Sequence, residues 1–258
     1  MKKLFLVILL IAIYTLLLGC SQSFMTTEQQ TACSDLEEIS CTTSPNHLYN
    51  GITNDGGFAY EVSNGTAKIT EVLVEDCSVI IPNEIDGYPV TILGSNAFYQ
   101  KHRCKSIILP STLETIESGA FYRCNAIVEI RIPLSVKHVA ADAFFRLDSL
   151  QNIHVEHGSE YFCDINGVLF TADMTELVAF PEGKNVDSYV IPDSVTTIRP
   201  GSFGYCPAVS KLTIPASVTM FPDAPFAAIL QNITIISCKN SAAEAYAARF
   251  SVCFEEFS

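Results

Sequence analysis

The sequence predicts a solenoid in which similar turns stack and each turn contributes a short strand. The first observation is a constant spacing from a proline to a phenylalanine, with two apolar residues between them, such as Leu113 and Ile116. This spacing occurs at Pro110–Phe121, Pro133–Phe144, Pro192–Phe203 and Pro215–Phe226. The second observation is that Phe98, Phe121 and Phe144 follow one another at equal intervals. A fixed period between about 20 and 50 residues is typical of stacked repeats.

Each repeat has a simple physical interpretation. The Ile-x-Ile motif alternates with a period of two, which indicates a short strand with one buried face. Proline cannot donate to a strand ladder and ends the strand. A single turn cannot bury its own apolar side, so only stacking closes the core. We therefore predict an α/β leucine-rich-repeat solenoid of mostly short parallel strands and few helices. Its predicted core residues are Phe98, Phe121, Phe144, Phe203, Phe226, Cys124 and Cys206. The predicted strands lie near Ile107–Leu109, Ile130–Ile132, Ile153–Val155, Val190–Ile191 and Leu212–Ile214.

Residues 1–20 are predicted to be a targeting segment. Lys2 and Lys3 precede an apolar run, Leu4–Leu18, which is short for a membrane span and typical of a signal peptide. The run ends in Leu17-Leu18-Gly19-Cys20, which resembles the lipobox of bacterial lipoproteins, where the cysteine is diacylated. We expect a lipoprotein signal peptide and a lipid on Cys20; an ordinary secretory peptide and a single anchor helix are the alternatives. The resemblance implies an exported protein, lipid-anchored at the cell surface, on the outer membrane in a Gram-negative cell.

Residues 21–56 are predicted to be a flexible tether. They are rich in Ser and Thr, and they contain several acidic residues but no Lys or Arg. Such a composition offers little apolar surface to bury. Cys33 and Cys41 lie in this segment, and the sequence allows either a disulfide or two free thiols.

The solenoid, predicted for residues 57–258, needs a cover at each end. Residues 57–81 are predicted to be an N-terminal β cap, because Phe58, Tyr60 and Val62 alternate before the hairpin signal Asn64-Gly65. The next turn is longer than the regular ones, and we expect its extra residues in a surface loop. Residues 236–258 are predicted to be a C-terminal helix-strand cap, with a helix over Ser241–Arg249 and a strand over Val252–Phe257.

An insert at residues 156–191 interrupts the period, since the interval from Phe144 to Phe203 is more than twice the regular one. Two apolar runs, 166–170 and 177–181, indicate a β-hairpin. Insertions in repeat proteins collect on one face and often serve binding. The alternative, which we favour, is that the hairpin continues the stack with Phe170 and Phe180 in the core.

The repeat resembles the BspA-like, or Treponema pallidum-type, leucine-rich repeats of bacterial surface proteins. Ala120-Phe121-Tyr122-Arg123-Cys124 has this signature in full, and Ser202-Phe203-Gly204-Tyr205-Cys206 has it with Ser for Ala. The cysteine position holds Lys101, Leu147 and Ile229 in other turns, and Pro225 stands at the alanine position of the last. The resemblance implies adhesion to host matrix proteins or to other bacteria.

Composition argues against some functions. Without Lys2 and Lys3 the chain has 13 basic and 28 acidic residues, a net charge of −15. A nucleic-acid partner is not expected, because phosphate binding needs clustered Lys and Arg. We expect Cys104, Cys124 and Cys206 as core thiols. Cys238 and Cys253 are a possible pair across the C-terminal cap, which the sequence alone does not decide.

No catalytic motif is found in the sequence. His154-Val155-Glu156-His157 has a spacing of three and leaves a strand, whereas the metalloprotease motif needs two histidines four residues apart on a helix. We therefore expect no enzyme activity, no metal and no cofactor.

The predicted function is a surface-anchored binding module for a protein or glycan, with host matrix proteins among the candidates. Only the lipid anchor is expected to contact a membrane. A structural or assembly lipoprotein of the cell envelope is the alternative, and an enzyme is a remote one. The candidate binding face consists of the outward strand residues Ile108, Glu129, Arg131, Asn152, His154, Val190, Lys211 and Thr213. We expect Arg131 and His154 at its centre. The alternative is that this outward row contacts no ligand and that its residues have varied without constraint.

Overall fold

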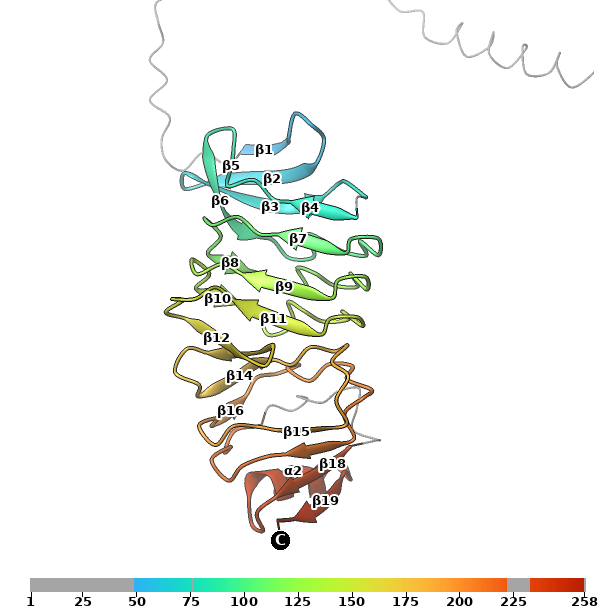
Figure 1. Ribbon diagram of the computed structural model, residues 1–258. Helices are drawn as coiled ribbons and strands as arrows, with labels where there is room; N and C mark the ends of the chain where they lie inside the picture. The colour runs from blue at the N-terminus through green and yellow to red at the C-terminus, as the bar shows by residue number, and fades with distance from the viewer. Residues whose placement is uncertain (1–48, 76, 222–232, 258) are drawn as a thin grey trace, which may run out of the picture. The chain divides into compact units, whose positions relative to one another are not determined.

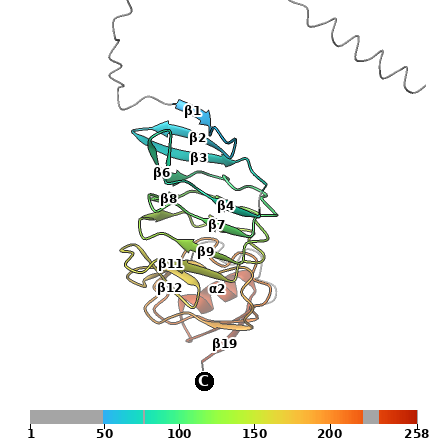
Figure 2. The same ribbon diagram turned by 45° about the horizontal axis from the view of Figure 1, so that its top comes forward.

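Two rows of short strands run along the solenoid, one on each side (Figure 1). The computed structural model describes residues 49–75, 77–221 and 233–257. The predicted signal peptide, the lipid site Cys20, the Cys33/Cys41 pair and Phe226 lie outside the described residues. In Figure 2 the turns are seen obliquely, one behind the next.

The first row contains the strands that the Ile-x-Ile motif predicts. Its members are β4 Ser78–Ile80, β7 Ser106–Ile108, β9 Glu129–Ile132, β11 Asn152–Val155, β15 Ser188–Val190, β17 Lys211–Thr213, β18 Thr234–Ser237 and β19 Cys253–Glu256. All pairs in this row are parallel, and the register follows the repeat, so that Arg131 faces His154 and Ile130 faces Ile153. In β9 exposed and buried residues alternate, as expected for a strand with one side against a core.

The second row contains the longer sheet of the N-terminal cap and the short strands after it. Its members are β1 Tyr49–Ile52, β2 Phe58–Ser63, β3 Thr66–Val72, β5 Glu84–Ile85, β6 Tyr88–Leu93, β8 Thr115–Ile116, β10 His138–Val139, β12 Phe162–Ile165, β13 Val168–Thr171, β14 Glu176–Ala179 and β16 Thr197–Ile198. The sequence analysis assigned Val-x-x-Ile only an inward apolar edge. The structure adds a two-residue parallel strand at the end of this motif in several turns.

A column of phenylalanine rings fills the centre of the turns before the insert. Phe98, Phe121 and Phe144 are buried, with ring centroids 5.4 Å and 5.7 Å apart. The amide of Phe98 donates to the carbonyl of Ala120 (2.8 Å), and that of Phe121 to the carbonyl of Ala143 (3.1 Å). These bonds cross from turn to turn, so both backbone and ring stack with the repeat. Phe203, Cys124 and Cys206 are also fully buried.

The N-terminal cap begins earlier than the sequence indicated. The tether was predicted to extend to residue 56, but Tyr49–Ile52 forms β1, which pairs antiparallel with β2. Gly51 lies against the buried ring of Tyr60, where a β-carbon would be 2.8 Å from the phenol oxygen. The polar composition of the segment concealed this strand, because its pairing depends on backbone bonds and on a glycine that fits a ring. The extra residues of the next turn form the tight antiparallel pair β5–β6, with Asp86 and Gly87 at positive φ.

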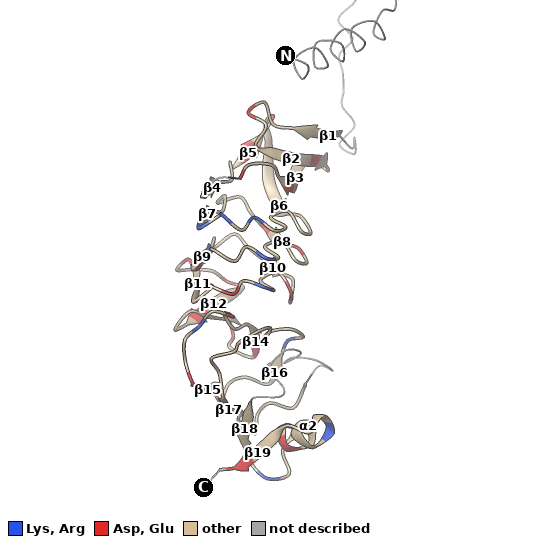
Figure 3. Cartoon of the chain, turned by 90° about the vertical axis from the view of Figure 1, so that its right-hand side faces the viewer, with Lys and Arg blue, Asp and Glu red and all other residues tan. Residues whose placement is uncertain are grey.

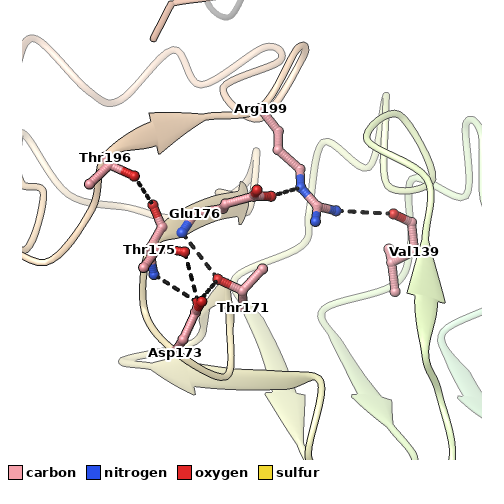
Figure 4. A network of polar contacts seen from close by, with 7 residues as sticks. All are labelled: Val139, Thr171, Asp173, Thr175, Glu176, Thr196 and Arg199. Carbon is pink, nitrogen blue, oxygen red and sulfur yellow. Dashed lines mark hydrogen bonds and ion pairs between the residues drawn. The ribbon is translucent and has the colours of Figure 1, made fainter. Parts of the chain in front are cut away.

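The insert is a three-stranded antiparallel unit, β12–β13–β14, whose last strand pairs with β16 of the following turn. Phe170 and Phe180 are buried, as in the alternative that we favoured. Figure 4 shows how polar contacts join the insert to both neighbours. Arg199 donates to Glu176 (2.6 Å) and to the carbonyl of Val139 (3.4 Å), and so connects the turns on either side.

The C-terminal cap is the helix α2 Ala242–Phe250 followed by β19. Ser241 caps the helix by accepting a bond from the amide of Glu244 (3.2 Å), and the Glu244 carboxylate accepts from the amide of Asn240 (2.5 Å). The helix ends at Ser251, which has a left-handed backbone. Ala243, Tyr246 and Ala247 form its buried side. Among the described residues no helix is long and apolar enough to span a membrane.

Candidate functional site

The outward side chains of β4, β7, β9 and β11 form a surface that we call the strand face. Its middle row contains Ile80, Ile108, Arg131 and His154. Ile80 is 63% and Ile108 56% exposed, and Arg131 is exposed as well. The parallel row two residues earlier contains Ser78, Ser106, Glu129 and Asn152, in which the hydroxyl groups of Ser106 and Ser78 share a hydrogen bond of 2.9 Å.

The insert ends the strand face after β11. Asp164 of β12 accepts from the amide of Val155 (2.8 Å) and lies 3.6 Å from the imidazole of His154. Gly167 packs on Asn152 so closely that a β-carbon would lie 2.3 Å from the Asn152 amide oxygen. Lys184 closes this edge by donating to the carbonyl of Asn166 (2.5 Å). His154 therefore lies at the edge of the strand face and not at its centre.

The other candidate residues lie on a separate sheet. Val190 pairs with Thr213 and Ser188 with Lys211 in the sheet β15–β17–β18–β19. One continuous outward row was expected, but β11 and β15 belong to different sheets. The hairpin β12–β13 contacts β11, where the amide of Ile153 donates to the carbonyl of Gly167 (2.9 Å). Spacing alone fixes which residues point outward; it does not show where an insert turns back across the face.

Metal-ligating side chains and the buried thiols are the candidates for chemistry in the sequence. The described residues hold no group of three or more His, Cys, Asp or Glu side chains that could bind a metal ion. Burial raises the pKa of Cys104 to about 11 and that of Cys124 to about 12, and it raises the pKa of Cys206 as well. Thiols with raised pKa values are poor nucleophiles, so these are core residues.

Cys238 and Cys253 are free and exposed. Cys253 of β19 lies opposite Thr234 of the neighbouring strand β18. Cys238 is four residues beyond Thr234 in the sequence, just after the end of β18. At about 3.3 Å per residue this offset is roughly 13 Å, well beyond the reach of a disulfide. The sequence left open whether Cys238 and Cys253 form a disulfide, and the structure shows two free thiols.

The turn side of the solenoid has an outer aromatic column that the sequence analysis did not identify. Tyr99 stacks on Tyr122 (5.7 Å between centroids), and Tyr122 on Phe145 (6.2 Å). The signal was present in the sequence, because each of these rings directly follows a core phenylalanine. In the turn of Phe203 the corresponding residue is Gly204.

Glu182 lies against Gly204, which also lies close to the ring of Phe145. It is only 4% exposed, and burial raises the pKa of its carboxyl to about 7. The backbone amides of Tyr205 and Arg146 act in the opposite direction on this pKa, although neither carboxylate oxygen has a hydrogen bond of normal geometry within the described residues. In the turn of Phe203, the buried carboxyl of Glu182 therefore lies next to Gly204, the position that corresponds to the outer rings of Tyr122 and Phe145 in the earlier turns.

Both strand rows, the central phenylalanine column and the two caps define a leucine-rich-repeat solenoid. The chain belongs to the family described as BspA type leucine rich repeat region, whose model matches residues 65–171 and 174–255 in six copies. No curated protein matches the chain significantly.

Solved bacterial leucine-rich-repeat proteins are similar to this chain at low identity. A protein from Eubacterium ventriosum is 17% identical, with a TM-score of 0.49, over 76% of this chain and 68% of that one. The pneumococcal vaccine antigen PcpA is 19% identical, with a TM-score of 0.40, over 77% and 69%. The T. pallidum leucine-rich-repeat protein is 18% identical, with a TM-score of 0.36, over 81% and 95%.

Proposed function

We propose that this protein is a non-catalytic binding module that recognises a protein or glycan partner through the strand face. The observation that carries the proposal is the row formed by Ile80, Ile108 and Arg131. Two isoleucines that are more than half exposed lie next to an arginine on rigid parallel strands. Exposed apolar groups beside an arginine are typical of contact sites, since buried apolar anchors and arginines supply much of the binding energy in interfaces.

Charge supports the choice of Arg131. The described Lys68, Lys101 and Lys137 of the same turns each pair with a glutamate, at 2.8, 2.6 and 2.8 Å. Arg131 has no such partner within the described part of the chain, and its register neighbour is His154. Figure 3 shows basic positions around β7 and β9, with acidic positions at many places along the described part of the chain. An acidic group of the partner would therefore meet a free guanidinium on this face.

The test is an array of extracellular matrix proteins and glycans, probed with the purified chain. The variant combines Ile108→Asp with Arg131→Glu, and its matched control combines Val190→Asp with Thr213→Glu on the separate sheet. We expect the first variant to lose at least tenfold in affinity for every partner found and the control to bind as the wild type. Equal binding by both variants, with unchanged melting temperatures, would move the site away from the strand face.

We further propose that the protein is exported and anchored by a lipid on Cys20. The support is the sequence of residues 1–20, in which Lys2 and Lys3 precede an apolar run that ends at Gly19-Cys20. Cys20→Ser is expected to leave a precursor of full length, with Ser21→Ala as the matched control. Mass spectrometry of the mature N-terminus decides the question, and cleavage at another position without acylation would contradict the proposal.

A further inference from the structure

A polar groove lies on the turn side of the solenoid, apart from the strand face. Its volume is about 240 Å³, and it is lined by His102, Arg123, Asn125, Arg146 and Asp148. The repeat brings these side chains together, because Arg123 and Arg146 hold the same position in consecutive turns, as do His102, Asn125 and Asp148 in succession. Three consecutive turns thus supply two parallel rows of polar groups to one depression.

The two arginines line the same groove. Six described Lys and Arg residues have a carboxylate within 4.0 Å: Lys68, Lys101, Lys137, Arg199, Lys211 and Lys239. Arg123 and Arg146 have no such partner among the residues that the structure describes, although Asp148 lines the same groove. With a formal net charge of −13, the chain has acidic groups in excess. Two guanidiniums that remain unpaired beside one another can therefore receive an external anion.

Aromatic rings hold both guanidiniums in place. That of Arg123 lies 5.5 Å from the ring centroid of Tyr122, and that of Arg146 lies 6.0 Å from Phe145 and 5.7 Å from Tyr205. Such contacts restrict long side chains before a ligand arrives, which lowers the entropic cost of binding. Both arginines have a left-handed backbone, with φ of 63° and 62°, a conformation that favours glycine or asparagine. The backbone therefore does not explain why arginine stands there.

The groove also offers a hydrogen-bond acceptor, the exposed carboxylate of Asp148. The side-chain oxygen of Asn125 is covered by the protein and is not within reach of a ligand in the groove. A simple inorganic anion would be repelled by Asp148. A ligand that fits all of these groups carries a negative charge together with hydroxyl donors.

We propose that this groove binds a single acidic sugar residue, with its carboxylate on Arg123 and Arg146 and its hydroxyl groups donating to Asp148. The volume agrees with one sugar ring, since pockets for larger ligands hold roughly 300–1,000 Å³. Bidentate pairing of arginine with a carboxylate supplies the charge recognition. The site shares no residue with the strand face, so it stands or fails independently of the function proposed above.

The test is calorimetric titration of the full chain with methyl glucuronide, methyl sialoside, methyl glucoside and acetate. We expect at least one acidic sugar to bind at least tenfold more tightly than the glucoside and than acetate. Arg123→Gln combined with Arg146→Gln is expected to remove this binding. Lys137→Gln, which removes a cation already paired with Glu114, is the matched control and should bind as the wild type. Melting temperatures verify that each variant is folded.

A second variant separates sugar recognition from simple attraction of an anion. Asp148→Ala removes the acceptor of the sugar hydroxyl groups, and it is expected to weaken the acidic sugar at least threefold without weakening acetate. The proposal is overturned if neither acidic sugar binds, if acetate binds as tightly as the sugars, or if the double arginine variant retains wild-type affinity.

Discussion

The turns before the insert and the turns after it share a repeat but differ in what they present outward. Before it, Arg123, Arg131 and Arg146 have no carboxylate partner among the described residues, and an aromatic column covers the turn side. After it, Arg199, Lys211 and Lys239 are paired with glutamates. Gly204 and the buried Glu182 lie next to Phe145, the last ring of the column. Lysines are paired with glutamates on both sides of the insert. The two sides therefore differ in their arginines and in the aromatic column, not in their lysines.

The largest expected effect comes from the central column that both halves need. Phe121→Ala removes a fully buried ring that stacks on Phe98 and Phe144, and it should cost about 3–5 kcal/mol of unfolding free energy. Phe203→Ala, which loses the stack with Phe180 at 4.9 Å, should cost a similar amount. Urea unfolding measures both. A loss of unfolding free energy below about 1 kcal/mol at either site would mean that the buried phenylalanine rings contribute little to the stability of the core.

The next effect concerns Glu182, near the end of the insert, and depends on pH. The Glu182 carboxyl has its pKa raised from the ordinary 4.5 to about 7, so the folded state binds a proton that the unfolded state releases. The contribution of this carboxyl to stability is then greatest below pH 4.5 and falls as the pH rises through about 7, by about 3 kcal/mol. Glu182→Gln should remove this loss and be the more stable protein at pH 8, with little difference at pH 4.

Urea unfolding of the wild type and the variant at pH 4, 6 and 8 tests this expectation. Glu160→Gln, which changes an exposed carboxylate, is the matched control and should not alter the pH dependence of stability. Parallel pH profiles for the wild type and Glu182→Gln would contradict the account.

A smaller effect is expected where Glu182 meets the neighbouring turn. A β-carbon at Gly204 would lie 1.9 Å from the carboxylate oxygen of Glu182 and 3.1 Å from the ring of Phe145. Gly204→Ala should therefore cost about 1–3 kcal/mol through overpacking. In a Glu182→Ala background the cost should shrink, since the clashing atoms are gone. A double-mutant cycle measures this coupling, and strict additivity would show that the two residues do not compete for space.

The smallest effect concerns the outer column of the half before the insert. Tyr122→Leu keeps an apolar side chain but loses two stacked neighbours and the ring under Arg123, so we expect about 0.5–1.5 kcal/mol of destabilisation. Thermal unfolding of this variant and of Tyr205→Leu compares the two halves. A larger loss at Tyr205, which has no stacked ring in the described part of the chain, would reverse the comparison.

The fold was largely predictable because the same apolar residues recur at the same positions of each repeat. Phe121 and Ile130 recur with the period, and the period alone placed the strands and the core. The capping box at Ser241 and Glu244 likewise identified the last helix. By contrast, β1 lies in a polar segment and depends on Gly51 fitting a ring, a contact between distant residues that local composition does not reveal.

The candidate site was predictable only in part. Alternation in Ile-x-Ile correctly directs Ile108 and Arg131 outward. The division of the outward row depends on where Asp164 and Gly167 turn back toward β11, and spacing contains no such information. The groove at Arg123 and Arg146 had a signal in the repeat, since arginine follows the aromatic residue in two consecutive turns. Spacing alone does not show that the loops which carry these arginines enclose a groove.

Hydrogen exchange of the chain with and without a partner found on the array tests the central claim most directly. The account predicts slower exchange on binding in β4, β7 and β9, where Ile80, Ile108 and Arg131 lie, and unchanged exchange in β15 and β17. Protection confined to β15 and β17, with β7 and β9 unchanged, would contradict it and assign the contact to the half after the insert.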